Sequence, residues 1–490
     1  MTNFISSFII EFTLATLNSS LQNIFPFTPT SDQKEAINSL LEFTDSTFSK
    51  ELYMLKGYAG TGKTTLISSY IQFLQSRETN FILMAPTGRA AKVLSNYSGE
   101  IALTIHKSIY YQQNVDGKVV FSLQKNKLSN CIFIVDEASM IGNGGALGAS
   151  FNSQQKTLLD DLVEFVYTGG NCKLILIGDL AQLPPVGTEE SPALNKDYLK
   201  SRYSLSVNMD ELQEVTRQSL DSGILHNATG LRKKISDNSV RYPFFDLQEF
   251  SDIKKLIGED IEDKLSSHYS LDGVESSIVI CRSNKQANGF NKYIRFNVLY
   301  MEDELAAGDL LMVVKNNYFW LDQSVDTGFI ANGDVVEVLR INNYEDRFGF
   351  SFANVSVRFS GVAHKDGQEL EVKLLLDTLY TETPALNRDQ NNKLYEEVSE
   401  SYSDIRDRRK RLQAVKKDEY FNAVQIKFSY AITCHKAQGG QWKNAFVDQG
   451  YLTDEMVNKE YLRWLYTAVT RAQENLYLLN FNDKFFEEEE

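Results

Sequence analysis

Cysteine is scarce in this chain, and the few cysteines present follow no pattern. The four cysteines are scattered along the chain: Cys131, Cys172, Cys281 and Cys434. No Cys-x-x-Cys pair occurs among them. A disulfide framework or a zinc site built from thiolates requires clustered or regularly spaced cysteines. The sequence therefore supports neither, and a reducing cytoplasm is the expected setting.

Long apolar runs are also rare, and the one exception is at the N-terminus. Residues 1–27 are apolar, but they lack a basic start and are interrupted by Glu11, unlike a secretory signal. Phe4, Phe8 and Phe12 fit helical spacing. We therefore expect a helical extension that packs on the body or docks a protein partner. No other segment approaches the length that spans a bilayer, so no membrane role is expected.

Basic residues are outnumbered: 50 Lys and Arg stand against 65 Asp and Glu, a net charge of −15. A chain with this balance is not expected to coat nucleic acid by bulk electrostatics. The net charge does not exclude a local basic surface. Residues 406–417 carry seven basic residues against one acid. This run is either a solvated helix face or a contact for backbone phosphates. Residues 485–490 are expected to be an acidic, solvated tail.

Short apolar runs that end in polar corners alternate with helical patterns in the first part of the chain. The runs 81–86, 131–137 and 172–179 are typical of buried strands in a parallel sheet. Polar residues gather at their C-terminal ends, where ligands bind in open α/β sheets. Residues 276–294 repeat the strand-and-helix pattern and open a second α/β domain, which segments near the C-terminus, including 422–442, would close.

Two insertions interrupt this α/β pattern. Residues 107–128 alternate in polarity on both sides of Asp116-Gly117, a strong hairpin signal. Either a projecting functional hairpin or a plain surface hairpin fits this pattern. Residues 309–421 are first β-rich with Gly turns and then strongly charged. We expect a small β-barrel followed by one or two charged helices.

Residues 55–66 read LKGYAGTGKTTL, a Gly-x4-Gly-Lys-Thr spacing between an apolar strand and a helical pattern. Glycines let backbone N–H groups face phosphates without side-chain clashes. We expect Lys63 to reach the β- and γ-phosphates of ATP, and Thr64 to offer its hydroxyl to Mg²⁺. The expected ATP contacts in this loop are Gly57, Gly60, Thr61, Gly62, Lys63, Thr64 and Thr65.

Two acids and one amide follow the next strands. Asp136 at a strand end is expected to hold Mg²⁺ as a second metal ligand, and Glu137 to position and deprotonate the attacking water. Gln182 lies just beyond the following strand in GDLAQLPPVG, a loop stiffened by two prolines. It is either part of a rigid turn or an amide that responds to the γ-phosphate. Because the same sequence contains the phosphate loop and the two acids, the second interpretation is favoured.

Two arginines complete the candidate site. Arg217 and Arg471 both lie beyond the first domain in sequence. The charge on a transferring phosphoryl group requires cations from outside the phosphate loop, as an arginine finger provides. A surface ion pair is the alternative for each arginine, and the residues alone leave both possibilities open.

Together these stretches resemble the motifs of the superfamily 1B DNA helicases, in particular the RecD-like and Dda-like group. Nine matching stretches occur in order between residues 28 and 480: TSDQKEAI, GYAGTGKTT, APTGRAAKVL, TIHKSI, VDEAS, GDLAQLPPVG, EVTRQ, TCHKAQGGQW and YTAVTRAQ. The resemblance implies that Gln33 reads the adenine edge, that Arg217 and Arg471 contact the γ-phosphate, and that Gln182 couples hydrolysis to movement.

The resemblance also implies contacts outside the phosphate site. Gln441 matches a position that commonly contacts the ribose, although many relatives carry an acid there. Thr87, His106 and His435 fall at positions that contact single-stranded DNA in the family. The hairpin resembles the pin that separates strands at a duplex junction, and the β-rich insertion resembles an SH3-like subdomain.

The implied fold class is α/β: two RecA-like P-loop NTPase domains with parallel sheets, a β-hairpin pin insertion and an SH3-like β-barrel insertion. The expected organisation is a helical extension (1–27), a first RecA-like domain (28–106 and 129–205), a pin (107–128), a second RecA-like domain (206–308 and 422–484), the barrel with its charged arm (309–421) and an acidic tail (485–490).

The resemblance implies an ATP-dependent DNA helicase that uses Mg²⁺ and acts on single-stranded DNA and single-strand/duplex junctions. The direction 5′→3′ comes from the resemblance only. One alternative is a translocase on single strands that displaces proteins without separating a duplex, and RNA as the track is a variant of it. An ATP-gated DNA-binding module is the alternative from another class. A module of that kind does not need the water-positioning Glu137, and this favours hydrolysis.

Overall fold

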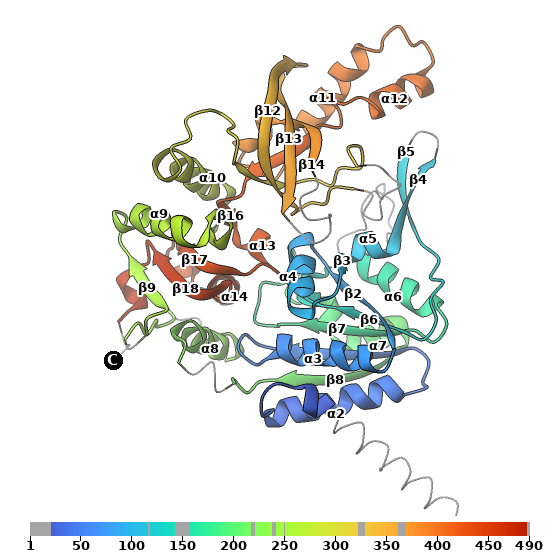
Figure 1. The fold of residues 1–490 in the computed structure, drawn as a ribbon, viewed down its shortest axis with the longest axis vertical. Coiled ribbons are helices and arrows are strands. Elements are labelled where there is room, and N and C mark those ends of the chain that lie inside the picture. The colour runs from blue at the N-terminus through green and yellow to red at the C-terminus, as the bar shows by residue number, and fades with distance from the viewer. Residues whose placement is uncertain are drawn as a thin grey trace, which may run out of the picture. The chain divides into compact units, whose positions relative to one another are not determined.

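The computed structural model describes residues 21–115, 118–142, 156–216, 221–237, 242–248, 250–321, 329–360 and 369–487. The chain divides into two compact units, and Figure 1 labels their helices and strands. The first unit comprises Met1–Pro86, Val93–Tyr111 and Leu123–Arg232, and the second comprises Thr87–Lys92, Gln112–Ser122 and Lys233–Glu490. No helix among the described residues is long and apolar enough to cross a membrane. Most of the expected N-terminal extension, residues 1–20, lies outside the described residues, and its partner role stays a prediction.

The first unit is built on a six-stranded sheet of order β3-β2-β6-β7-β1-β8, and every strand pair in it is parallel. Strands β6 and β7 are buried at every residue, as strands covered on both faces must be. The strands are β1 (Glu51–Gly57), β2 (Asn80–Ala85), β3 (Ala102–Thr104), β6 (Cys131–Val135), β7 (Lys173–Gly178) and β8 (Ser206–Leu212). The helices are α2 (Ser31–Asp45), α3 (Lys63–Ser76), α4 (Gly88–Ser98), α5 (Ile105–Ile109), α6 (Leu158–Thr168), α7 (Lys196–Tyr203) and α8 (Gly223–Ser236). The start of α4 and the end of α8 are grouped with the second unit.

Strand β8 corrects the predicted boundary between the two domains. We expected the second domain to begin at residue 206, but β8 pairs along its whole length with β1. The first unit therefore extends to Arg232, within α8. Parallel pairing with a strand far earlier in the chain leaves no local trace in the sequence, so the boundary could not be placed from composition.

The predicted hairpin is present and is shorter than expected. Strands β4 (Tyr110–Val115) and β5 (Lys118–Leu123) form a two-stranded sheet, and Asp116 and Gly117 between them lie outside the described residues. The flanking parts of the predicted 107–128 segment belong to the body. Ile109 is fully buried in the core of the first unit, and Asn126 donates to the carbonyl of Val166 at 3.2 Å.

The second unit contains a parallel five-stranded sheet of order β16-β10-β17-β18-β9. Its strands are β9 (Ile253–Leu256), β10 (Ser277–Cys281), β16 (Ala431–Thr433), β17 (Trp442–Asp448) and β18 (Ala472–Leu479). Its helices are α9 (Asp260–Asp272), α10 (Asn284–Tyr293), α13 (Cys434–Ala437) and α14 (Lys459–Val469), and a π-helical turn, Ile294–Val298, follows α10.

A closed barrel interrupts the second sheet in sequence. It consists of β11 (Leu310–Val313), β12 (Val335–Arg347), β13 (Phe350–Ser360), β14 (Glu369–Leu375) and β15 (Val424–Phe428). Between β14 and β15 the chain forms α11 (Arg388–Glu400) and α12 (Arg408–Lys416). The predicted barrel and charged helices are thus present, but the predicted end of the insertion at residue 421 is wrong. Strand β15 pairs with both β11 and β14 and closes the barrel.

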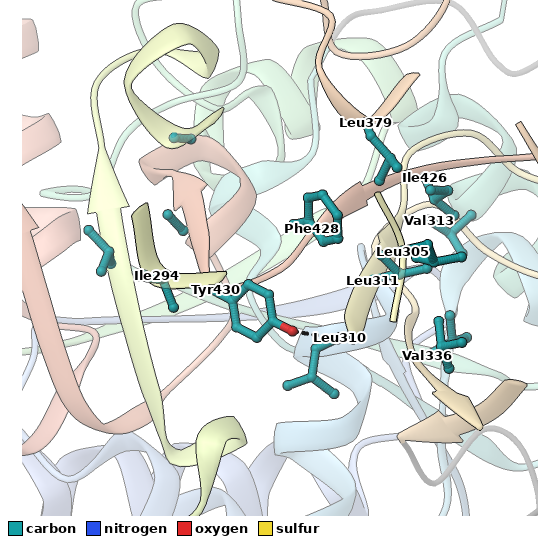
Figure 2. Packing of buried hydrophobic residues seen from close by; sticks show 14 of the residues in the cluster. Ile294, Leu305, Leu310, Leu311, Val313, Val336, Leu379, Ile426, Phe428 and Tyr430 are labelled. Atoms are coloured by element: carbon teal, nitrogen blue, oxygen red, sulfur yellow. Dashed lines mark hydrogen bonds between the residues drawn. The ribbon is translucent and has the colours of Figure 1, made fainter. Parts of the chain in front are cut away.

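The barrel and the second sheet share one hydrophobic core. Figure 2 shows Phe428 and Tyr430 beside Leu310 of the barrel, whose backbone N–H donates to the Tyr430 hydroxyl at 3.1 Å. A buried ion pair reinforces this junction: the Arg295 guanidinium donates twice to Asp309, at 2.8 and 2.9 Å. Because a buried charge is tolerated only with such partners, this pairing fixes the barrel onto the second sheet.

Candidate nucleotide-binding site

The glycine-rich loop after β1 has the backbone shape that its sequence predicts. Gly60 and Gly62 adopt left-handed conformations, with φ of 76° and 79°. A Cβ atom on Gly62 would lie 2.5 Å from Nε2 of Gln33, and one on Gly57 would lie 2.8 Å from Cγ of Lys63. Only glycine fits these positions without a shift of neighbouring atoms. The loop is therefore preformed as a concave run of backbone, the type of cradle that phosphates occupy.

Lys63 and the start of α3 supply positive charge to this loop. The Lys63 ammonium donates to the carbonyls of Gly57 and Tyr58, at 2.5 and 2.9 Å, so it lies across the loop. Helix α3 begins at Lys63, and its first backbone N–H groups and positive dipole end are at the loop. Thr64, the second residue of α3, is exposed. This arrangement suits an anion such as a phosphate.

Gln33 lies against the phosphate loop in a way that the sequence did not predict. The side chain is only 2% exposed, and its Nε2 donates to the carbonyl of Thr61 at 2.9 Å. Its Oε1 accepts from the backbone N–H of Thr30 at 3.0 Å, within the capping box that begins α2. Both ends of the amide are thus engaged, and Gln33 ties α2 to the loop. The predicted contact with an adenine edge stays a prediction.

Asp136 and Glu137 follow β6 directly, as predicted. The Asp136 carboxylate accepts from the Glu137 backbone N–H at 2.8 Å and from the Tyr97 hydroxyl of α4 at 2.7 Å. Burial, and then the nearby Asp136 charge, raise the pKa of Tyr97, so Tyr97 remains a donor at neutral pH. Glu137 has a left-handed backbone, with φ of 53°. This strained turn points two successive acids away from the strand end.

Gln182 has an unsatisfied polar atom. The residue is 7% exposed, and in the part of the chain that the structure describes its buried Oε1 has no hydrogen-bond partner. It follows β7 by a short turn in which Asp179 accepts from the backbone N–H of Ala181 at 2.9 Å. A buried amide oxygen without a partner is costly, and a bound ligand or water would relieve that cost.

Of the two predicted arginines, Arg471 is among the described residues and Arg217 is not. Arg217 lies outside the described residues, but the residue before it, Thr216, donates its backbone N–H to the carbonyl of Gly60 at 3.0 Å. Thr216 itself therefore lies beside the phosphate loop. Arg471 is 4% exposed in the second unit, where its guanidinium donates to the carbonyls of Thr467 and Gly440 at 3.0 and 3.1 Å.

The remaining predicted contact residues lie at loop or helix starts. Thr87 accepts at its Oγ1 from the Ala90 backbone N–H, at 3.2 Å, just before the first turn of α4. His106 is half-buried in α5, and burial lowers its pKa to about 4, so it is neutral at pH 7. In the second unit His435 is exposed on α13, and the exposed Gln441 accepts from Gln473 at 2.9 Å.

The donor set at this site fits a magnesium nucleotide. Among the described residues, no group of three or more His, Cys, Asp or Glu side chains could hold a metal ion. The candidate protein ligands for a metal ion are therefore the Thr64 hydroxyl and the Asp136 carboxylate, and the phosphate loop would hold the nucleotide. Mg²⁺ usually binds through one or two protein oxygens, waters and substrate phosphates, so this sparse set is appropriate to it.

Comparison with known proteins finds a family match in each α/β domain of the chain. Residues 40–188 match the AAA domain family, and residues 428–479 match the UvrD-like helicase C-terminal domain family. The ATP-dependent DNA helicase dda of Enterobacteria phage T4 is 26% identical over 326 residues, covering 63% of this chain and 67% of that protein. The RecBCD enzyme subunit RecD of Buchnera aphidicola is 23% identical over 483 residues, covering 90% and 72%. These matches are consistent with the predicted resemblance to the superfamily 1B helicases.

A third relative matches this chain over nearly its whole length. An uncharacterized protein of Acanthamoeba polyphaga mimivirus is 24% identical over 510 residues, covering 91% of this chain and 98% of that protein. The predicted resemblance to helicases is supported by the family matches in each α/β domain and by the dda and RecD relatives.

Tyr97 is a site residue that the sequence did not predict. It occupies the last turns of α4, in none of the stretches that carried the resemblance. Its contact with Asp136 joins side chains that are 39 residues apart in sequence. No spacing rule predicts such a contact, because it depends on how α4 lies beside the end of β6.

Proposed function

We propose that this chain is an ATP-dependent DNA helicase that moves along single-stranded DNA and separates the strands of a duplex. The observation that carries the proposal is the preformed phosphate loop after β1 together with the Asp136–Glu137 turn after β6 of the same parallel sheet, in a chain similar to a phage DNA helicase. The loop provides a place for ATP, and the adjacent acids provide the chemistry to hydrolyse it.

We propose distinct roles for the residues at this site. Glu137 would take a proton from the attacking water, and Lys63 would stabilise the charge that develops on the β- and γ-phosphates. Thr64 and Asp136 would hold Mg²⁺, which neutralises phosphate charge when bound. Arg217 and Arg471 are the proposed arginine fingers. Gln182, whose buried Oε1 has no hydrogen-bond partner among the described residues, would respond to the γ-phosphate.

The same proposal assigns the residues that contact single-stranded DNA and the element that separates a duplex. Thr87, His106 and His435 are proposed contacts to single-stranded DNA. Because His106 is neutral at pH 7, we propose that it contacts DNA by stacking or a neutral hydrogen bond and not by charge. The β4–β5 hairpin is the proposed pin at the duplex junction. The proposed direction, 5′→3′, rests on the family resemblance alone.

Replacement of Tyr97 with Phe should lower the rate of ATP hydrolysis by about tenfold, since a lost hydrogen bond to a charged group is typically worth about 1.5–3 kcal/mol. It should also raise the Mg²⁺ concentration needed for half-maximal activity, because Asp136 would lose the donor that orients it. Steady-state hydrolysis measured across a Mg²⁺ titration provides this test. Tyr70→Phe is the control: Tyr70 is a buried tyrosine in the same unit, and its hydroxyl bonds to Thr44 at 2.7 Å, away from Asp136 in sequence. An unchanged Mg²⁺ dependence in Tyr97→Phe would refute the positioning role.

Strand displacement on tailed duplexes tests the proposed function. A labelled duplex carrying a 5′ single-stranded tail should be separated in the presence of ATP, whereas a blunt duplex should not. A 3′-tailed duplex of the same sequence tests the direction of travel. Hydrolysis stimulated by single strands without any displacement would instead indicate a translocase that moves without unwinding.

A further inference from the structure

The helical arm formed by α11 and α12 is a rigid part of the second unit. In Figure 1 these helices lie beyond the barrel strands β12 and β13. A separate hydrophobic cluster joins Phe352 and Leu375 of the barrel to Leu394 and Val398 of α11 and Val415 of α12. Each of these side chains is at most 3% exposed. Burial of this extent fixes both helices to the barrel and does not leave them as a solvated linker.

A buried cation reinforces this attachment. Lys373 of β14 is 1% exposed, and its Nζ lies 3.1 Å from Glu345 of β12 and 4.0 Å from the ring centre of Tyr420, which follows α12. The Tyr420 hydroxyl donates to the same Glu345 carboxylate. This hydrogen bond, and then the contact with Lys373, lowers the pKa of Glu345 to about 2. A fully engaged polar network of this kind specifies one orientation of the arm.

The arm presents a concentrated positive charge. Arg408, Arg409 and Lys410 occupy the first turn of α12 and are exposed, and Arg406 is exposed just before it. Arg411 next to them is half-buried. None of these five side chains forms an ion pair with any residue that the structure describes. In a chain of net charge −15, this cluster is a local excess of positive charge.

The position of these cations is unfavourable for the helix itself. The first turn of a helix is its positive end, where acidic side chains are stabilising and basic ones are not. The single compensating group is Asp407, whose carboxylate accepts from the backbone N–H groups of Arg409 and Lys410 at 2.8 and 3.1 Å. Helix stability therefore does not explain why three successive cations stand there. An external polyanion would explain them.

We infer that the N-terminal turn of α12 is a second nucleic-acid contact, one that binds backbone phosphates outside the ATPase site. Guanidinium and ammonium groups on a rigid helix match the spaced charges of a phosphodiester chain. The exposed side chains contact phosphates and not bases, so the contact is independent of sequence. The inference rests on the proposed function, because it takes nucleic acid as the partner. Its role is to hold the nucleic acid against the barrel while the α/β domains change state.

The triple substitution Arg408→Gln, Arg409→Gln and Lys410→Gln tests this contact. Glutamine has a helix propensity similar to that of lysine and removes charges that disfavour the first turn, so α12 should remain folded. DNA affinity is measured by fluorescence anisotropy against salt concentration, on a single strand and on a blunt duplex of the same length. The log–log slope should fall by about 2 for whichever form the arm holds, since each lost phosphate contact removes about 0.7–0.9.

The matched control removes three charges from exposed lysines elsewhere: Lys200→Gln, Lys233→Gln and Lys254→Gln. This control should leave the slope unchanged. If the arm variant keeps the slope of the original chain on both DNA forms, the inference is overturned, and the arm surface would then suit an acidic protein instead. If the original chain neither binds DNA nor hydrolyses ATP faster with it, the proposed function and the inference fail together.

Discussion

Lys63→Ala should reduce ATP hydrolysis by at least about 100-fold, which is the usual cost of losing one charge-stabilising group in an active site. The ammonium of Lys63 lies across the phosphate loop, held by two carbonyls of that loop. In the proposed mechanism it is the one side-chain cation that the loop itself supplies to the β- and γ-phosphates. Steady-state hydrolysis with saturating single-stranded DNA measures this loss.

The control for this substitution is Lys200→Ala, which removes an exposed lysine from α7 in the same unit. It should hydrolyse ATP at the original rate. Thermal unfolding of Lys63→Ala should be close to that of the original chain, because the parallel sheet around β1 does not depend on the lysine side chain. Normal turnover in Lys63→Ala would refute the assignment of this loop as the nucleotide site.

Removal of the β4–β5 hairpin should abolish strand separation and leave DNA-stimulated hydrolysis intact. The exchange must replace residues 112–122 only, by a short Gly-Ser turn. The flanking residues belong to the core: Ile109 is fully buried, and the Tyr110 hydroxyl donates to Asp161 at 2.7 Å. A wider deletion across the predicted 107–128 segment would damage the first unit and confuse the two effects.

The hairpin variant contains its own control. Its hydrolysis with and without single-stranded DNA reports whether the α/β domains still work, and strand displacement on a tailed duplex reports whether the pin does. Loss of displacement with retained stimulation is the expected result. Equal displacement by the variant and the original chain would contradict the pin assignment and leave the hairpin as a surface feature.

Elements that local chemistry decides were predictable from the sequence. The Asp116-Gly117 pair between alternating residues indicated the hairpin, and β4 and β5 flank it. The Gly57-x4-Gly62 spacing predicted a loop with left-handed glycines, and Gly60 and Gly62 have that backbone. In the hairpin and in the phosphate loop, the local residue types favour one backbone conformation directly. These conformations can therefore be predicted without knowing any contact between distant residues.

Elements that distant pairing decides were not predictable. Strands β8 and β15 were each assigned to the second α/β domain, yet β8 extends the first sheet and β15 closes the barrel. An apolar run shows that a strand is buried but does not say which strand lies beside it. The Tyr97–Asp136 hydrogen bond was missed for the same reason.

The measurement that tests the central claim most directly is ATP hydrolysis by the whole chain with and without single-stranded DNA. The account predicts low hydrolysis alone and a strong increase on addition of a single strand, with Lys63→Ala inactive in both conditions. That result would couple the site at the phosphate loop to a nucleic-acid track. Hydrolysis by the original chain at the same rate with and without DNA would contradict the account.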